Sequence, residues 1–218
     1  MKVTTDACIQ GAWTPLMPHV KRVLDVGTGT GLLALMLAQR NKDILIDGIE
    51  FDKDAAMQAA ENVKVSEWNG RLKIIEGDAR NYSTLDKYDL IISNPPFFNN
   101  SLLSDKDNKN LARHTLSLTY TDLLKVLDNN LAEDGYMSIM LPFIEYQQWK
   151  ELLHQNGWFE IASLSVSHSA QASVKRVVGL FSKKKLTIIG ESTLVIRKDE
   201  DNYTEAFIDL LSPFYLNL

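Results

Sequence analysis

A glycine-rich turn between a strand and a helix constrains the fold of this chain more than any other feature. Residues 22–26 read as a short buried strand, and residues 32–38 form a strongly helical run. Between them, Gly27, Gly29 and Gly31 follow a G-x-G-x-G spacing. Glycine is required there because the backbone turns tightly and a ligand must approach it without a Cβ in the way. The segment predicts an α/β fold that binds a nucleoside-type ligand at the end of its first strand.

Strand and helix patterns alternate through the first two thirds of the sequence. The expected strands are residues 22–26, 44–50, 72–76, 88–93 and 136–141, and the expected helices are residues 32–38, 54–66, 121–130 and 145–156. We expect Asp54 to cap the second of these helices and Gly157 to end the fourth. The alternation predicts a doubly wound, Rossmann-like sheet that is mostly parallel and carries helices on both faces.

The last third changes character, because its β-type runs have no long helix between them. These runs are residues 159–167, 177–182 and 192–197, followed by a final helix at residues 204–211. They predict antiparallel additions to the sheet. We expect the whole chain, residues 1–218, to form a single domain. Its abrupt start leads us to expect that a native N-terminal arm is missing or shortened.

The composition is that of an ordinary soluble globular protein, with 45% hydrophobic and 23% charged residues. Cys8 is the single cysteine, so no internal disulfide can form, which indicates a reducing compartment. No stretch approaches the roughly 18 apolar residues of a membrane span, and no secretory signal is present. We therefore expect a cytoplasmic protein without a membrane or metal partner. Its oligomeric state stays open, with a monomer as the simplest expectation.

An acidic residue follows the glycine turn at the distance typical of ribose recognition. Glu50 ends the next expected strand, where a carboxylate can accept hydrogen bonds from both ribose hydroxyls, and Phe51 follows it. The third glycine comes earlier than in dinucleotide sites, and Asp25 before the turn would repel a phosphate. S-adenosylmethionine has an ammonium, a sulfonium and no phosphate, so it is the predicted cofactor. Asp78 and Ala79 are placed at its adenine amino group, and the alternative for Asp78 is a turn or helix-cap residue.

A rigid loop follows the fourth expected strand and reads Asn94-Pro95-Pro96-Phe97-Phe98. The prolines fix φ and push Asn94 out of the helical region, at the sheet edge where ligands bind in open α/β folds. There the Asn94 side-chain oxygen and the Pro95 carbonyl can each accept one N–H of a planar amine, while Phe97 stacks on its ring. Pro96 and Phe98 are expected to contact the same acceptor. The loop predicts methyl transfer to a nitrogen by positioning, without a strong general base.

Asn-Pro-Pro-Phe after a G-x-G-x-G turn resembles the class I S-adenosylmethionine-dependent methyltransferases that act on planar amino or amide nitrogens. Four further stretches, at residues 1–6, 11–13, 112–115 and 214–216, are similar to a narrower group. That group is the bacterial tRNA (adenine-N6) methyltransferases that modify the adenosine just 3′ of the anticodon in a valine tRNA. The resemblance implies an adenosine in tRNA as the acceptor. It also places Thr5 and Asp6 over the methyl donor.

The charge distribution is compatible with a nucleic-acid partner although the net charge is −5. Residues 158–198 hold seven basic and two acidic side chains, a local excess of the kind that phosphate binding needs. Lys175 and Arg176 are candidates for the tRNA backbone, and the alternative is a solvated basic hairpin. Arg113 and His114 are candidates for a phosphate or base contact, and the alternative is a surface arginine beside a helix-capping histidine.

Three other functions remain open from the residues alone. A protein glutamine-N5 methyltransferase would use the same acceptor loop, although it would need no basic patch. An RNA guanine-N2 methyltransferase is a further possibility. A non-catalytic nucleoside-binding module would need only the donor turn.

Overall fold

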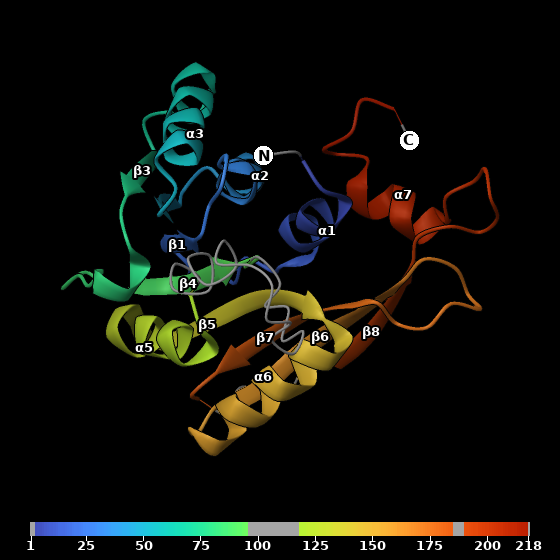
Figure 1. Cartoon of the computed structure of the whole chain (residues 1–218). Helices are drawn as coiled ribbons and strands as arrows, with labels where there is room; N and C mark the ends of the chain where they lie inside the picture. The colour runs from blue at the N-terminus through green and yellow to red at the C-terminus, as the bar shows by residue number, and fades with distance from the viewer. Residues whose placement is uncertain (1–2, 96–117, 185–189, 218) are drawn as a thin grey trace, which may run out of the picture.

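The fold is a single eight-stranded sheet with helices on both faces (Figure 1), seen in a computed structural model that describes residues 3–95, 118–184 and 190–217. The strands are β1 (Arg22–Val26), β2 (Leu45–Glu50), β3 (Leu72–Glu76), β4 (Tyr88–Ser93), β5 (Leu131–Pro142), β6 (Phe159–Ser167), β7 (Arg176–Ser182) and β8 (Gly190–Val195). The helices are α1 (Thr5–Trp13), α2 (Leu32–Arg40), α3 (Lys53–Val65), α5 (Tyr120–Asn130), α6 (Phe143–Gln155), α7 (Glu205–Leu211) and the 3-10 helix η1 (Ala79–Asn81). The strand order is β3-β2-β1-β4-β5-β7-β6-β8, which confirms the predicted doubly wound architecture.

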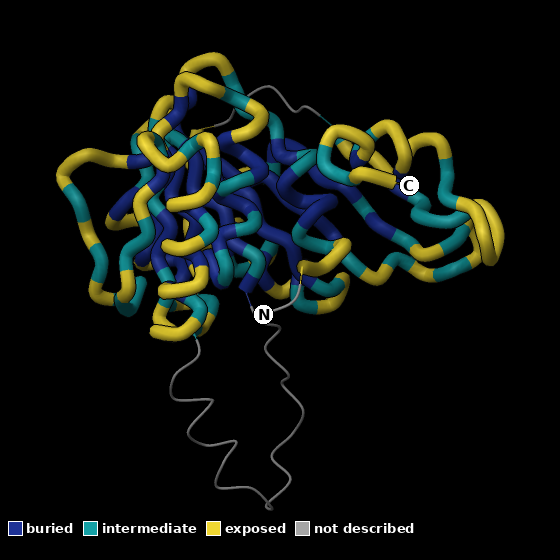
Figure 2. Tube along the Cα trace, turned by 90° about the horizontal axis from the view of Figure 1, so that it is seen from above, coloured by how far each residue is buried: buried dark blue, intermediate teal, exposed yellow. Residues whose placement is uncertain are grey.

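Neighbouring residues of the central strands pack into different layers because successive side chains of a strand point to opposite faces. Leu24 and Ile91 lie opposite each other on paired strands and join the core beneath α5 and α6. Val23 and Leu90, one residue earlier, join the core beneath α2 and α3. Both layers are buried in the interior of the molecule (Figure 2). Full burial of each such side chain contributes about 1.5–3 kcal/mol, so the sheet is held from both sides.

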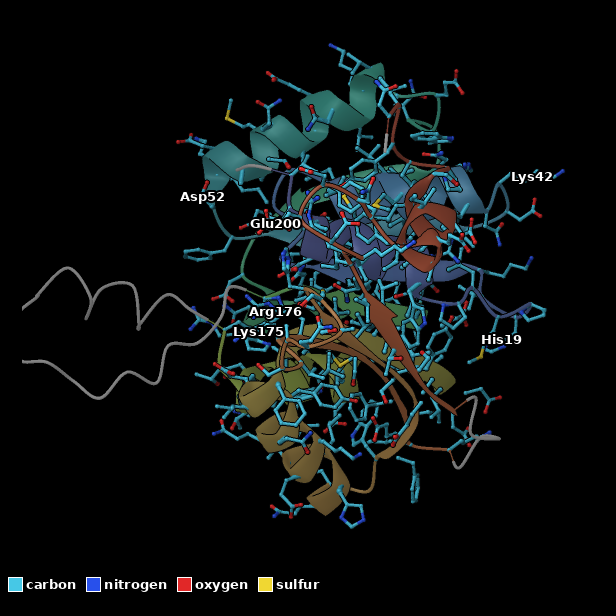
Figure 3. All side chains as sticks on the ribbon, turned by 90° about the vertical axis from the view of Figure 1, so that its right-hand side faces the viewer. His19, Lys42, Asp52, Lys175, Arg176 and Glu200 are labelled. Carbon is cyan, nitrogen blue, oxygen red and sulfur yellow. The ribbon has the colours of Figure 1, made fainter. Side chains whose placement is uncertain are left out.

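All strand ends that carry the predicted site lie at one edge of the sheet. β1, β2, β3, β4 and β5 are parallel, and we call the edge where they end the carboxyl edge. β7 runs antiparallel to both of its neighbours, which confirms the predicted antiparallel addition there, whereas β8 pairs with β6 in parallel. The start of β7 therefore lies at the carboxyl edge. Figure 3 shows Asp52, Lys175 and Arg176 on that side, and His19 and Lys42 on the other.

Two helix ends test the capping predictions. Asp52, with an extended backbone (φ −74°, ψ 117°), is the N-cap of α3, and its side chain accepts a hydrogen bond from the Ala55 amide at 2.8 Å. The predicted cap at Asp54 was wrong, because Asp54 already lies in the first turn of the helix, where its charge favours the helix dipole. Gly157 follows α6 with φ +78°, as predicted for a helix-ending glycine.

Helix α1 was not predicted from the sequence. Its N-cap is Thr4, whose hydroxyl accepts a hydrogen bond from the Ala7 amide at 3.3 Å. α1 packs against α2 and α7 with Cys8 and Ile9 in a shared core. A Cβ on Gly11 would lie 2.8 Å from Met36 Sδ, so glycine permits the close approach of α1 to α2. In the described part of the chain, no helix is long and apolar enough to cross a membrane.

Candidate functional site

The glycine turn and Asn94, the first residue of the acceptor loop, are neighbours at the carboxyl edge. β1 and β4 are paired, with Val26 opposite Ser93, so Gly27 and Asn94 each follow directly after a member of this pair. Ser93 Oγ also donates a hydrogen bond to the Val26 carbonyl at 2.8 Å, which ties the two strand ends together. The two segments that the sequence marked for a donor and an acceptor are thus brought side by side.

The glycine turn presents bare backbone to open space at Gly27. Gly27, Gly29 and Gly31 have φ values of +72°, +59° and +86°, which L side chains rarely adopt. The amides of Gly27 and Thr28 donate to the Ile49 carbonyl at 2.9 and 3.1 Å, so the turn is anchored to the end of β2. A Cβ built on Gly27 would meet no atom within 4 Å. The turn therefore has room beside it for a ligand that approaches the backbone closely.

Glu50 connects the turn to the start of α3. Its Oε2 accepts a hydrogen bond from the Gly29 amide at 2.8 Å, and its Oε1 accepts one from the Asp52 amide at 2.9 Å. Each carboxylate oxygen can accept a further bond, because an ionised carboxylate offers about four acceptor positions. Phe51, the next residue, is 49% exposed. A fixed acceptor beside an exposed aromatic ring fits the ribose and adenine of a nucleoside such as S-adenosylmethionine.

Asp25 lies behind the glycine turn, fully buried at the end of β1. Its Oδ2 accepts a hydrogen bond from Thr28 Oγ1 at 2.5 Å, whereas its Oδ1 has no hydrogen-bond partner among the described residues. Burial is the largest cause that raises the pKa of Asp25 from its usual 3.8 to about 7. The carboxylate thus supports the turn from within, and its predicted interaction with a cationic ligand remains a prediction.

Asp25 makes the stability of the protein depend on pH. Its pKa is higher in the folded than in the unfolded chain, so its contribution is greatest below about pH 4 and is lost as the pH rises towards 7. Relative to the Asp25→Asn variant, the unfolding free energy of the wild-type protein should fall by about 1.4 kcal/mol per pH unit across that window. Denaturant unfolding of both proteins between pH 5 and 8.5 measures this difference. A difference that is independent of pH would contradict the assigned protonation.

Asp78 caps η1 through its Oδ1, which accepts a hydrogen bond from the Arg80 amide at 2.9 Å. The Arg80 guanidinium also binds this carboxylate, with Nη2 at 2.6 Å from Oδ2, and these hydrogen bonds lower the pKa of Asp78. The capping alternative is therefore realised. A contact of Asp78 or its neighbour Ala79 with adenine remains a prediction. For Asp78, one carboxylate oxygen would have to accept hydrogen bonds from both adenine and Arg80.

The predicted substrate contacts fall into two groups. Lys175 is exposed at the carboxyl edge, and Arg176 Nε donates to Asp6 Oδ2 at 2.9 Å (Figure 3). This ion pair links the start of β7 to α1, whose first residue is Thr5. The remaining predicted residues, Pro96, Phe97, Phe98, Arg113 and His114, lie outside the described residues.

The basic side chains of residues 158–198 are divided between the two edges of the sheet. β7 carries the chain from Arg176 at the carboxyl edge to Ser182 at the opposite edge. There Lys183 pairs with Asp128 at 2.7 Å, and Lys184 pairs with Glu133 and Asp134. These two lysines are therefore neutralised on the side away from the candidate site.

Gln10 lies beside the candidate site, although no sequence pattern marked it. It is fully buried, and its Nε2 donates to the Ser93 carbonyl at 3.0 Å and to the Ser138 carbonyl at 3.4 Å. Thr14 extends the network, with its Oγ1 at 2.7 Å from Ser138 Oγ. Gln10 thus holds the peptide unit that leads into Asn94 from the side of α1. A lone glutamine in an unpredicted helix carried no sequence signal for this role.

Gln10→Leu should lower kcat about tenfold with little change in donor affinity, because it frees the peptide before Asn94 while leaving the glycine turn intact. The buried Ser93 carbonyl also loses the hydrogen bond that Gln10 Nε2 donates to it, which should lower the unfolding free energy by about 1–3 kcal/mol. Steady-state kinetics and donor titration separate the two effects. Gln39→Leu is the matched control, since Gln39 Nε2 donates to the Pro213 carbonyl at 2.8 Å on the exposed side of α2. Lower stability with an unchanged kcat would reject the positioning role.

Comparison with known proteins gives a consistent result. Residues 13–140 match the family described as the methyltransferase small domain. A tRNA1(Val) (adenine(37)-N6)-methyltransferase of Dyadobacter fermentans is 36% identical over 99% of this chain and 91% of its own length. The protein of the same name from Tolumonas auensis is 39% identical over 100% of this chain and 91% of its own length.

Solved structures agree on the fold. A predicted O-methyltransferase from Agrobacterium tumefaciens superposes with a TM-score of 0.73 at 13% identity, covering 95% of this chain and 96% of that one. A ribosomal protein L11 methylase from Lactobacillus delbrueckii superposes with a TM-score of 0.58 at 19% identity, covering 83% of this chain and 79% of that one. At these identities the likeness concerns the fold alone.

Proposed function

Because this chain belongs to the tRNA1(Val) (adenine(37)-N6)-methyltransferase family, we propose that it transfers a methyl group from S-adenosylmethionine to the N6 amino group of adenosine 37 in a valine tRNA. The proposal includes a cytoplasmic location, because the tRNA substrate is present in the cytoplasm. The alternatives that the residues left open, a glutamine amide or a guanine amino group, become outcomes of the test.

One structural observation carries the proposal. The Val26–Ser93 pair sets the start of the glycine turn beside Asn94, and the Gly29 amide of that turn donates to the Glu50 carboxylate. Two ligand groups held at these adjacent strand ends would meet at the carboxyl edge, where ligands bind in open α/β sheets. Reactants held in this way react faster because their relative orientation is set before the reaction begins.

S-adenosylmethionine, when bound, supplies a methyl group on a positively charged sulfur. The protein's part is to bind and orient. The glycine turn leaves space against its backbone, Glu50 offers carboxylate oxygens to ribose hydroxyls, and Phe51 offers an aromatic face. On the acceptor side, the Asn94 side-chain oxygen and the Pro95 carbonyl each accept an N–H of the adenine amino group. Holding both N–H groups directs the nitrogen lone pair away from these acceptors, which makes a conjugated amine more nucleophilic.

A direct assay tests the proposal. The protein is incubated with labelled S-adenosylmethionine and a valine tRNA transcript, the RNA is digested, and the labelled nucleoside is identified. We expect label in N6-methyladenosine, and no label in a transcript with guanosine at position 37. Label in N2-methylguanosine would overturn the proposed acceptor. So would label in a glutamine-containing protein substrate, offered in a parallel reaction, while the tRNA stays unlabelled.

A further inference from the structure

Two exposed apolar side chains open helix α6, directly after β5. Phe143 is 44% exposed and Ile144 is 69% exposed. Single exposed apolar residues are common on protein surfaces, so exposure alone carries no meaning. These two residues are adjacent in sequence and lie where the chain leaves the carboxyl edge, and this placement requires an explanation.

Strand register places Phe143 near Asn94, the first residue of the acceptor loop. β4 and β5 are parallel neighbours with Ser93 opposite Ile139, and β5 runs on to Pro142 before α6 begins. With about 3.3 Å per residue and about 4.8 Å between strands, the Phe143 backbone lies about 11 Å from that of Asn94. A base in the acceptor site and a flanking nucleotide can span such a distance.

Lys175 lies opposite Phe143 on the neighbouring chain segment. Pro142 pairs with Arg176 across the β5–β7 ladder, and the Phe143 amide donates to the Lys175 carbonyl at 3.3 Å. The Lys175 side chain is exposed and forms no ion pair with any described residue. Arg176, in contrast, pairs with Asp6. The carboxyl edge beyond Asn94 thus carries an aromatic ring, an aliphatic side chain and an exposed positive charge.

We propose that Phe143, Ile144 and Lys175 form a contact surface for the single-stranded RNA that flanks the acceptor adenosine. Phe143 stacks on a flanking base, Ile144 extends the apolar contact, and Lys175 binds a neighbouring phosphate. A nucleotide has both features that this surface complements, a flat apolar face and a negative charge, and aromatic rings beside basic groups are how proteins hold unpaired strands. This inference rests on the proposed function, since it takes tRNA as the substrate.

The surface is tested with tRNA binding and steady-state methylation. Phe143→Ala should raise both the Kd and the KM for tRNA about tenfold, the loss expected for one base–aromatic stack, while kcat and donor affinity stay within about twofold. Phe143→Trp should restore tRNA affinity. Lys175→Ala should reduce the slope of log affinity against log salt by about 0.7, because one phosphate contact to a single strand is lost. Phe143→Ala should leave that slope unchanged.

Matched controls come from the opposite edge of the sheet. Phe159, the first residue of β6, is 40% exposed there, so Phe159→Ala removes a similar ring far from the acceptor loop. Lys183, paired with Asp128, gives the corresponding lysine control, Lys183→Ala. If Phe143→Ala and Phe159→Ala change tRNA affinity equally, the proposal that Phe143, Ile144 and Lys175 contact RNA is wrong.

Failure of the proposed function has a different signature. If the wild-type protein methylates no tRNA, the proposed function is wrong. The affinity of the variants for tRNA still tests the contact surface in that case. If Phe143→Ala raises the KM of a glutamine-containing protein substrate and leaves tRNA binding unchanged, the occupant is a protein and the RNA assignment is wrong.

Discussion

Asn94→Ala should reduce methyl transfer to tRNA by at least about a hundredfold, while the Kd for S-adenosylmethionine changes by less than about twofold. Loss of one preorganised hydrogen-bonding group at a reacting centre typically costs this much in rate. The donor turn should be unaffected because its anchoring bonds run to Ile49 and Glu50, not to Asn94. Single-turnover rates with saturating tRNA and calorimetric titration of the donor measure the two quantities.

Asn69→Ala is the control for this prediction. Asn69 is an exposed amide in the connection between α3 and β3, at the edge opposite the site. It should change neither the rate nor the donor Kd. If Asn94→Ala weakens donor binding as much as it slows the reaction, donor and acceptor functions are not separable at this edge. An unchanged rate would remove Asn94 from the catalytic machinery.

Glu50→Ala should have the second largest effect, a loss of donor affinity of at least about a hundredfold. The carboxylate holds the Gly29 and Asp52 amides at 2.8 and 2.9 Å, and it is also the proposed acceptor for ribose hydroxyls. Hydrogen bonds to a charged group contribute about 1.5–3 kcal/mol each, so the loss of two such bonds exceeds a factor of a hundred. Calorimetric titration with S-adenosylmethionine measures the change.

Glu50→Gln and Glu61→Ala define the specificity of this effect. Glutamine keeps one acceptor oxygen but sets an NH2 group against a backbone donor, so its donor affinity should lie between those of the wild type and Glu50→Ala. Glu61 is an exposed glutamate of α3, and Glu61→Ala should bind the donor normally. An unaltered donor Kd in Glu50→Ala would show that Glu50 serves only to shape the turn.

Local sequence patterns predicted the bounds of four strands to the residue. Residues 22–26, 72–76, 88–93 and 159–167 were expected as strands and form β1, β3, β4 and β6 with these bounds. Each reads as a short run with apolar residues bounded by polar or turn residues, so its limits are visible without tertiary information. The glycine turn was equally readable, because positive φ values call for glycine.

Prediction failed where a local signal had two meanings. Asp52 and Asp54 are both suited to an N-cap, and the backbone conformation at the end of β2 selected Asp52. At Asp78 the cap that the sequence left as an alternative is realised, because its carboxylate accepts from the Arg80 amide and binds the Arg80 guanidinium, and its contact with a ligand stays a prediction. α1 was missed, and with it Gln10, whose contacts at Ser93 and Ser138 lie far away in sequence.

Several features of this protein depend on local backbone chemistry and could be read from the order of its residues: the glycine turn, the Asn94-Pro95 segment, the parallel strands that carry them, and the resemblance that relatives confirmed. Which distant residues share the carboxyl edge depends instead on how the strands pair in the folded chain. Residues 158–198 looked like one basic segment in the sequence. Because β7 runs antiparallel to β5, however, Lys175 lies at the carboxyl edge and Lys183 lies at the opposite edge. The register between β4 and β5 likewise places Phe143 near Asn94. Strand direction and register are set by hydrogen bonds between segments remote in sequence, so no local pattern could reveal them.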